Sequence, residues 1–242
     1  MPDPASLYRG HRVPAEAIAH AVRLYRRFAR SFRDVEALLA ERGVTVSHET
    51  VRRWVATFGA HTADERRRRA ARPGRTWHLD EMAVRLGGRL PWVWRAVDEH
   101  GTTRDVLRQA HRDTAAAAER FFRRLWAVAE GAPPERITTD KLGSYAAAMT
   151  RLPEMTSVEH VQVRSVLRGN NRVEQAHQPT RGRERVMRRF KSAPSAQRFL
   201  DAFSRVGNLV RPGRHRLGAA SYRAIMRERV ATWRAVAGLR AA

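Results

Sequence analysis

The chain has 242 residues, which suffices for one large domain or for a catalytic domain with a smaller one attached. Its formal net charge of +23, from 47 Lys+Arg against 24 Asp+Glu, indicates a polyanionic partner, most simply nucleic acid and less readily a membrane surface. The sequence contains no cysteine, which excludes disulfides, thiolate zinc sites and cysteine nucleophiles, so any metal must bind to oxygen or imidazole ligands.

Residues 14–43 predict two amphipathic helices. Pro14 opens a stretch in which apolar side chains recur at three- and four-residue spacing, as on the buried face of a helix. Ser31 and Asp34 then match a capping box at the start of "VEALLAERG". Gly43 can take the left-handed conformation that ends this second helix.

A third helix is predicted over 48–59, "HETVRRWVATFG", with Ser47 as its cap. Its two faces differ in character: Val51, Trp54, Val55 and Phe58 face inward, and His48, Glu49, Arg52 and Arg53 face outward. Two short helices joined by a glycine turn, the second with arginines outside, are typical of helix-turn-helix DNA binding, although any small three-helix unit shows a similar pattern. We therefore predict a DNA-binding domain over 1–62 that contacts DNA through His48, Arg52 and Arg53.

Beyond Thr76 the apolar period changes from that of a helix to that of a strand. Strand-like segments separated by Gly87 and Gly88 predict an antiparallel meander, followed by a long helix and a short strand that ends at Asp140. This order predicts an α/β domain of the ribonuclease-H-like kind over 76–205, with helices flanking a mixed sheet.

The flanking segments are predicted from charge and periodicity. "ADERRRRAARPGR" indicates a basic linker over 63–75. Within 206–242, apolar side chains from Tyr222 to Trp233 recur on one face and predict a C-terminal helical tail that covers the catalytic domain or a partner subunit. The N-terminus lacks a signal-peptide pattern, and no apolar run approaches the roughly 20 residues that span a bilayer, so we expect a cytoplasmic protein.

Two carboxylates stand out because each belongs to a predicted strand. Asp80 alternates onto one strand face with His78, and Asp140 ends the fourth strand. A half-buried carboxylate is costly unless it is paired or bound to metal. If Gly87 and Gly88 form a two-residue turn, Asp80 pairs with Arg95 across the hairpin, so a cross-strand ion pair is the alternative to a metal site.

A third acid lies in a polar, basic helix. Glu174, His177, Gln178 and Arg181 share one helical face, which in a structural helix would normally be apolar. An acid, an imidazole and a guanidinium in line favour metal binding and phosphate contact over packing. Glu81 and Asp98 are rival acids, but Glu81 points to the opposite strand face from Asp80 and Asp98 lies near the open end of the hairpin, so neither is expected to bind the metal.

The motifs "SFRDVEALLAERGVTVSHETVRRWV", "RPGRTWHLDE", "WRAVDEHG", "TTDKLGSY" and "NNRVEQAHQPTRGRERVMRRFKS" follow one another along nearly the whole chain. Together they resemble bacterial insertion-sequence transposases of the Asp-Asp-Glu (DDE) type, in the insertion-sequence six family. The resemblance places the catalytic and metal-binding triad on Asp80, Asp140 and Glu174, which are 60 and 34 residues apart, the second interval matching the family's spacing. It also places a basic residue beyond the glutamate on Arg181.

Small departures from the family pattern, "QAH" after the glutamate and Leu142-Gly143 before the serine, leave the triad intact. They leave open whether His177 and Lys141 support the acids or contact phosphate, and His177 can equally be an ordinary surface histidine.

The resemblance implies a two-metal site for attack on a phosphodiester by water or a DNA 3′-hydroxyl, with two Mg²⁺ ions for which Mn²⁺ substitutes. The implied partners are the terminal inverted repeats and target DNA, with the protein acting as a homo-oligomer, a dimer on DNA. Two alternatives remain: a helix-turn-helix regulator with an inactive catalytic domain, and a ribonuclease-H-like nuclease or resolvase.

Overall fold

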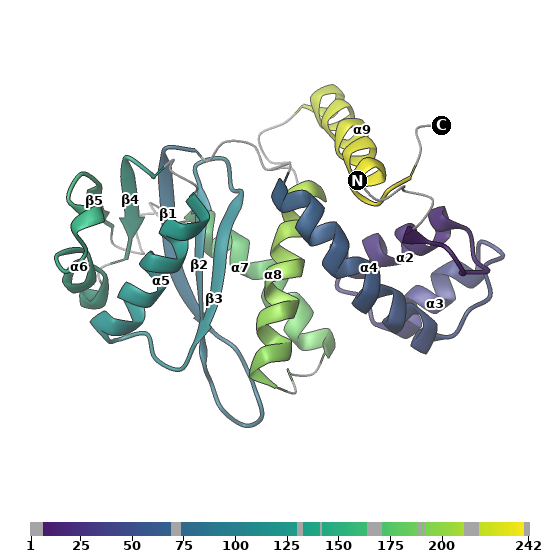
Figure 1. Ribbon diagram of the computed structural model, residues 1–242, viewed down its shortest axis with the longest axis horizontal. Coiled ribbons are helices and arrows are strands. Elements are labelled where there is room, and N and C mark those ends of the chain that lie inside the picture. The colour runs from purple at the N-terminus through teal and green to yellow at the C-terminus, as the bar shows by residue number, and fades with distance from the viewer. Residues whose placement is uncertain are drawn as a thin grey trace. The chain divides into compact units, whose positions relative to one another are not determined.

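The structure, a computed structural model, describes residues 7–68, 74–129, 133–140, 142–163, 171–187, 190, 192–210 and 218–239 (Figure 1). The chain forms two compact units: unit 1 joins Met1–Ala70 to Ala202–Ala242, and unit 2 is Ala71–Asp201. The division between them falls within helix α8 (Ala193–Val210). No helix in the described ranges is long and apolar enough to cross a membrane.

The helices predicted near the N-terminus are present in unit 1, as α2 (Ala15–Arg27), α3 (Phe32–Ala40) and α4 (His48–Arg68). Both halves of the predicted capping box form, since Asp34 N donates to Ser31 Oγ and Ser31 N donates to Asp34 Oδ2. Gly43 has a φ of 74°, the left-handed conformation expected at the end of α3. The inward side chains predicted for α4 are all buried: Val51, Trp54, Val55 and Phe58.

Helix α4 is longer than the helix predicted over 48–59, and its last residues overlap the basic linker predicted over 63–75. The helix passes through Gly59, where a Cβ atom would lie 2.7 Å from Nη2 of the buried Arg26. Glycine at this position therefore serves close packing rather than helix termination. Thr62 adds hydrogen bonds from its hydroxyl to the carbonyls of Phe58 and Gly59, and the following arginines are good helix formers.

Helix α9 (Ala219–Val236) belongs to unit 1. The Tyr8 hydroxyl donates to the Ala237 carbonyl at 2.7 Å, and Arg229 Nη1 donates to the Asn208 carbonyl at 3.0 Å. The hydrogen bond of Tyr8 thus joins segments from near the two ends of the chain within unit 1.

A mixed sheet forms the centre of unit 2. In the described residues its strand order is β3-β2-β1-β4-β5. Strands β1, β2 and β3 are antiparallel neighbours, whereas β4 is parallel to both β1 and β5. This topology confirms the predicted ribonuclease-H-like fold class. The strands are β1 (Thr76–Ala83), β2 (Trp92–Asp98), β3 (Thr103–Gln109), β4 (Arg136–Thr139) and β5 (Glu159–Gln162).

The β1–β2 hairpin has the predicted register. Gly87 and Gly88 both have positive φ, 54° and 82°, and the residues that flank them exchange backbone hydrogen bonds. Asp80 consequently lies opposite Arg95, as expected.

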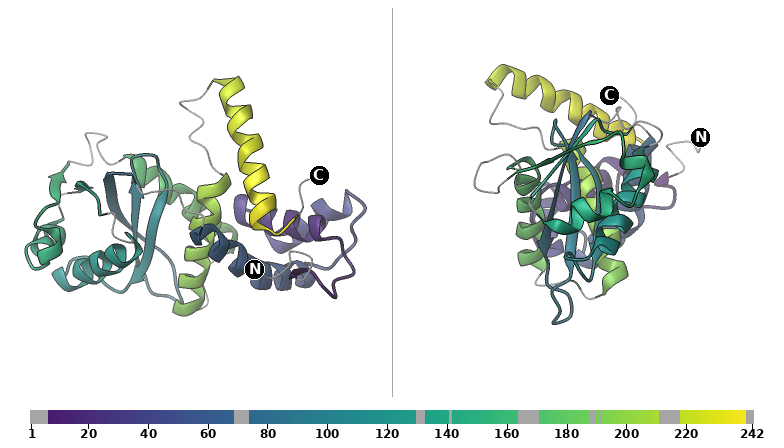
Figure 2. Two further views of the ribbon diagram at one scale, coloured as in Figure 1. Left: turned by 45° about the horizontal axis from the view of Figure 1, so that its top comes forward. Right: turned by 90° about the vertical axis from the view of Figure 1, so that its left-hand side faces the viewer.

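Helices cover both faces of the sheet (Figure 2). They are α5 (Ala115–Ala129), α6 (Gly143–Met149), α7 (Asn171–Met187) and α8. Trp77, Leu79 and Trp94 pack with α5 and α6 on one face, and Met82 and Val93 pack with α8 on the other. Alternate residues of β1 therefore face two different cores, as the period of two requires.

Strand β5 and helix α6 were not among the predicted elements. The side chains of β5 are partly or fully exposed, without the alternation that marks a strand, and backbone pairing with β4 holds it in place. Helix α6 is seven residues long and has no side-chain cap at its N-terminus. A short 3₁₀ turn, η1 (Pro153–Met155), lies between these two elements along the chain.

Candidate active site

Asp80 lies on the face of β1 that α7 covers. Its side chain is 19% exposed, and its Oδ2 atom is 3.5 Å from Nε2 of His177 on α7. The cross-strand neighbour Arg95 is buried, and its guanidinium donates to the Ala176 carbonyl at 2.8 Å and to the Thr180 hydroxyl at 2.7 Å. Arg95 thus fastens α7 to the sheet beside Asp80.

Asp140 reaches the same place from the neighbouring strand. Because β4 runs parallel to β1, with Thr138 opposite His78, its carboxyl end leads toward Asp80. Asp140 follows the last residue of β4, and its Oδ1 atom accepts a hydrogen bond from the backbone of Leu142. The two acids that the sequence places on separate strands are therefore brought together.

Glu81 joins them, which contradicts the expectation that it lies away from Asp80. Asp80, Glu81 and Asp140 each offer a ligand atom, and these atoms lie within 4.8 Å of one another. Glu81 does leave the opposite face of β1, opposite Trp94, as the period of two predicts. Its carboxylate still approaches that of Asp140, which directly follows the last residue of β4.

Electrostatics within this group favour a bound cation. Burial, with smaller contributions from the charges of Asp140 and Asp80, raises the pKa of Glu81 to about 8, although interaction with the Tyr145 hydroxyl lowers it. Three carboxylates this close repel one another when ionised, and a divalent cation relieves that repulsion. Clustered carboxylate oxygens are the ligands that Mg²⁺ and Mn²⁺ prefer, so the residues present fit a divalent metal ion.

Helix α7 contributes the next residues. His177 is 3% exposed, so it is not an ordinary surface histidine. Burial lowers the pKa of its imidazole, and the neighbouring Asp80 offsets part of that effect. Arg181 and Gln178, predicted on the same face, are exposed. Glu174 lies in α7 about one turn before His177, but its side chain is outside the described residues.

Comparison with known proteins identifies the family. Residues 74–212 match the model of a DDE domain family, a transposase type. The chain belongs to the DDE transposases of the insertion-sequence six family. The resemblance stated from the sequence motifs is thereby confirmed, and the chain is a polynucleotidyl transferase of DNA transposition.

Curated relatives include two transposases of Staphylococcus aureus, one for the insertion sequence-like element IS431mec in strain Mu50 and one for IS257 in transposon Tn4003. Each is 27% identical over 205 residues, which cover 84% of this chain and 88% of the relative. Similar solved structures include the catalytic core domain of BIV integrase, at 13% identity and a TM-score of 0.42, covering 66% of this chain and 99% of that one. The catalytic domain of Mos1 transposase, solved with Raltegravir and Mn, is 14% identical with a TM-score of 0.40, covering 76% and 95%.

Two further residues considered from the sequence are Asp98 and Lys141. Asp98, a rival acid in the sequence, accepts hydrogen bonds from the backbones of His100 and Thr102, so it shapes the β2–β3 turn. Lys141 is outside the described residues.

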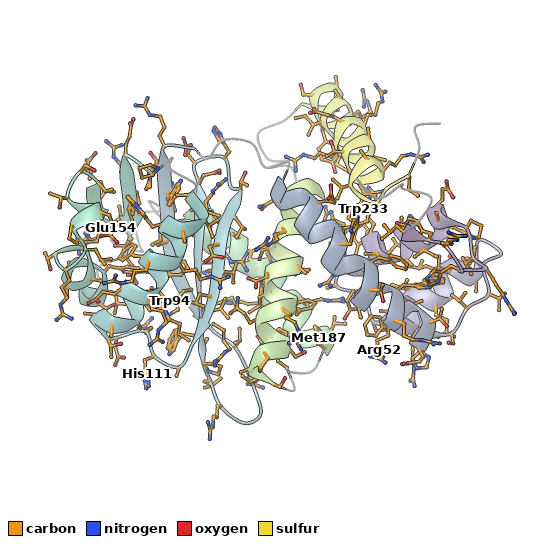
Figure 3. All side chains as sticks on the ribbon, viewed as in Figure 1. Arg52, Trp94, His111, Glu154, Met187 and Trp233 are labelled. Atoms are coloured by element: carbon orange, nitrogen blue, oxygen red, sulfur yellow. The ribbon has the colours of Figure 1, made fainter. Side chains whose placement is uncertain are left out.

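The predicted DNA-contacting residues of the transposase lie on the first turns of α4 in unit 1. Arg52, labelled in Figure 3, and Arg53 are both exposed. Arg52 forms two hydrogen bonds to Glu49, at 2.8 and 2.6 Å. His48 Nδ1 is 3.4 Å from Glu36 Oε2. One arginine of this face is thus partly neutralised by an acid of its own helix, which the sequence pattern did not reveal.

Proposed function

We propose that Asp80, Asp140 and Glu174 together bind two divalent metal ions, Mg²⁺ in the cell with Mn²⁺ able to substitute, and that this centre cleaves and joins DNA at the ends of an insertion sequence. The observation that carries the proposal is the approach of Asp80 and Asp140 from adjacent parallel strands in a chain of the DDE family. When bound, the ions activate water or a DNA 3′-hydroxyl and stabilise the leaving oxygen.

The chain's own residues then position the reactants. Arg95 contacts α7 and so holds His177 beside Asp80. His177 then orients the Asp80 carboxylate. Arg181 is exposed about one helical turn further on, where a guanidinium can bind a DNA phosphate in two-point fashion. Lys141, which directly follows Asp140, is proposed as a second phosphate contact.

We infer that residues 1–62 recognise the terminal repeats, with α4 as the recognition helix and His48, Arg52 and Arg53 as contacts. The exposed, basic start of α4 supports this inference, because a recognition helix reads DNA from its N-terminal residues. We assign the chemistry to residues 76–205. The basic linker over 63–75 and the C-terminal helical tail over 206–242 complete the proposed division.

We infer further that the transposase acts on DNA as a homo-oligomer, a dimer at minimum. An insertion sequence has two ends, and joining both to a target needs two strand-transfer reactions. Two copies of the carboxylate site supply them without dissociation between steps. Family membership supports the assignment of DNA as partner.

The experiment that tests this function separates it from both alternatives. Purified full-length protein is incubated with a duplex that carries the element's inverted repeats and with a scrambled duplex, with Mg²⁺ or with EDTA. We expect cleavage and joining that require both the repeats and Mg²⁺. Binding to the repeats without any nicking would show an inactive regulator, and metal-dependent cleavage that ignores the repeats would show a nuclease or resolvase.

A further inference from the structure

Glu81 is the feature of the centre that the Asp-Asp-Glu triad does not account for. It follows Asp80 directly on β1 and is 7% exposed. Neither of its carboxylate oxygens has a hydrogen-bond partner among the described residues. The ionised form of a carboxylate in this condition is unfavourable in the folded protein unless a positive charge compensates it.

The surroundings of Glu81 offer little compensation from the protein. On its face of the sheet it lies opposite Trp94, whose ring packs against Tyr145 at a centroid distance of 5.3 Å. The Tyr145 hydroxyl is buried and interacts with the carboxylate, but among the described residues no donor meets either carboxylate oxygen in hydrogen-bonding geometry. Arg112 also acts on Glu81 electrostatically, while its guanidinium lies over the ring of Trp92 at 4.3 Å.

The Glu81 carboxylate lies close to the two other acids of the site. One ligand atom of Glu81 lies within 4.8 Å of ligand atoms of both Asp80 and Asp140. Oxygens that share one Mg²⁺ lie at most about 4.2 Å apart, because each is about 2.1 Å from the ion, so a small side-chain movement brings these three acids into range of one cation. The packing of Trp94 and Tyr145 behind Glu81 fixes the side chain in this position.

We propose that Glu81 is a fourth carboxylate of the metal centre, which ligates a divalent cation jointly with Asp80 and Asp140. The proposal rests on the proposed function in that it places Glu81 at the same centre. It extends that function because the triad contains no residue from this face of β1. Glu81 contributes a ligand oxygen from the face of the sheet that packs against α5 and α6. Asp80 contributes one from the face that α7 covers.

The test measures metal binding and needs no DNA. Full-length wild type, Glu81→Gln and Asp140→Asn are titrated with Mn²⁺, and binding is followed by calorimetry and by the electron paramagnetic resonance of free Mn²⁺. Glu159→Gln is the matched control, because it removes an exposed carboxylate of the same sheet that pairs with Arg136. Circular dichroism confirms the fold of each variant, and Glu81→Met, which fills similar space without polar atoms, replaces any Gln variant that does not fold.

We expect Glu81→Gln to weaken Mn²⁺ binding by at least about tenfold, because loss of a residue that merely supports the ligands already costs roughly ten- to a hundredfold. In metal-free buffer, its melting temperature should equal or exceed that of wild type, since a buried acid without a hydrogen-bond partner among the described residues is gone. Wild-type affinity in a folded Glu81→Gln protein, beside weakened binding in Asp140→Asn, would overturn the role of Glu81 and leave the proposed function standing. Absence of Mn²⁺ binding in wild type itself would overturn both.

Discussion

Arg95 shows how a single buried side chain can position a helix beside the clustered acids. Its two hydrogen bonds to Ala176 and Thr180 bracket His177 on α7, so His177 faces Asp80 because Arg95 holds the helix there. The cross-strand position alone favours a simple Asp80–Arg95 ion pair. The observed contacts give Arg95 a different partner and leave the metal-binding interpretation of Asp80 intact.

Replacing Arg95 with methionine should therefore destabilise the protein and misplace α7. Loss of two charge-assisted hydrogen bonds from a buried site predicts a decrease of about 2–4 kcal/mol in the free energy of unfolding, measured by urea denaturation. The control Arg151→Met removes an exposed guanidinium that pairs with Glu119 and should change stability by about 1 kcal/mol or less. Equal effects of the two substitutions would contradict the anchoring role of Arg95.

At the scale of elements, the parts that the sequence predicted are those governed by local rules. The capping box at Ser31, the left-handed Gly43 and the two-glycine hairpin each depend on a few neighbouring residues, and each was predicted correctly. The parts that it missed depend on distant contacts. Strand β5 exists through its pairing with β4, and Gly59, at which the sequence predicts the end of a helix, lies inside α4 and leaves room for Arg26.

At the site, too, the features set by neighbouring residues were predicted and those set by distant contacts were not. The period of two assigned Asp80 and Glu81 to opposite faces of β1 correctly, and the strand-end position of Asp140 was recognised. The meeting of Glu81 with the other two acids could not be predicted, because it follows from where β4 ends relative to β1. Burial of His177 likewise depends on the docking of α7 onto the sheet.

The recognition role of α4 leads to a prediction at this scale. Substituting Arg52 and Arg53 together with alanine should strongly weaken binding to the terminal repeats in a gel-shift assay, because both are exposed on the proposed recognition helix. Arg33→Ala combined with Arg42→Ala removes the same charge from exposed positions near α3 and serves as the control. If both double variants bind the repeats equally well, α4 is not the recognition helix.

At the scale of the whole molecule, the net charge of +23 governs the binding of the protein to DNA. A chain this basic neutralises many phosphates and releases the cations condensed on the duplex, and this release drives binding at low salt. The clustered carboxylates are a local excess of negative charge in this basic chain. Metal ions bound to them can screen that charge from the DNA phosphates.

DNA binding should accordingly be strongly salt-dependent. With on the order of 6–10 phosphate contacts, the affinity should fall about 10³–10⁵-fold between 50 and 200 mM salt. Fluorescence anisotropy with a labelled duplex over this range measures the slope directly. A flat response would mean that the excess of arginine serves some purpose other than phosphate contact.

The account as a whole depends on the claim that Asp80, Asp140 and Glu174 act as one metal centre. Its most direct test is Mg²⁺-dependent cleavage and strand transfer on a duplex carrying the element ends, run for each single alanine variant beside a binding assay. Each substitution should abolish cleavage and joining while the ends remain bound, because loss of any ligand unseats a metal ion and the DNA contacts lie elsewhere. Glu159→Gln, which removes an exposed acid of the same sheet, should cleave as wild type does. Near-normal cleavage by Asp80→Ala would show that this carboxylate is structural and would contradict the account.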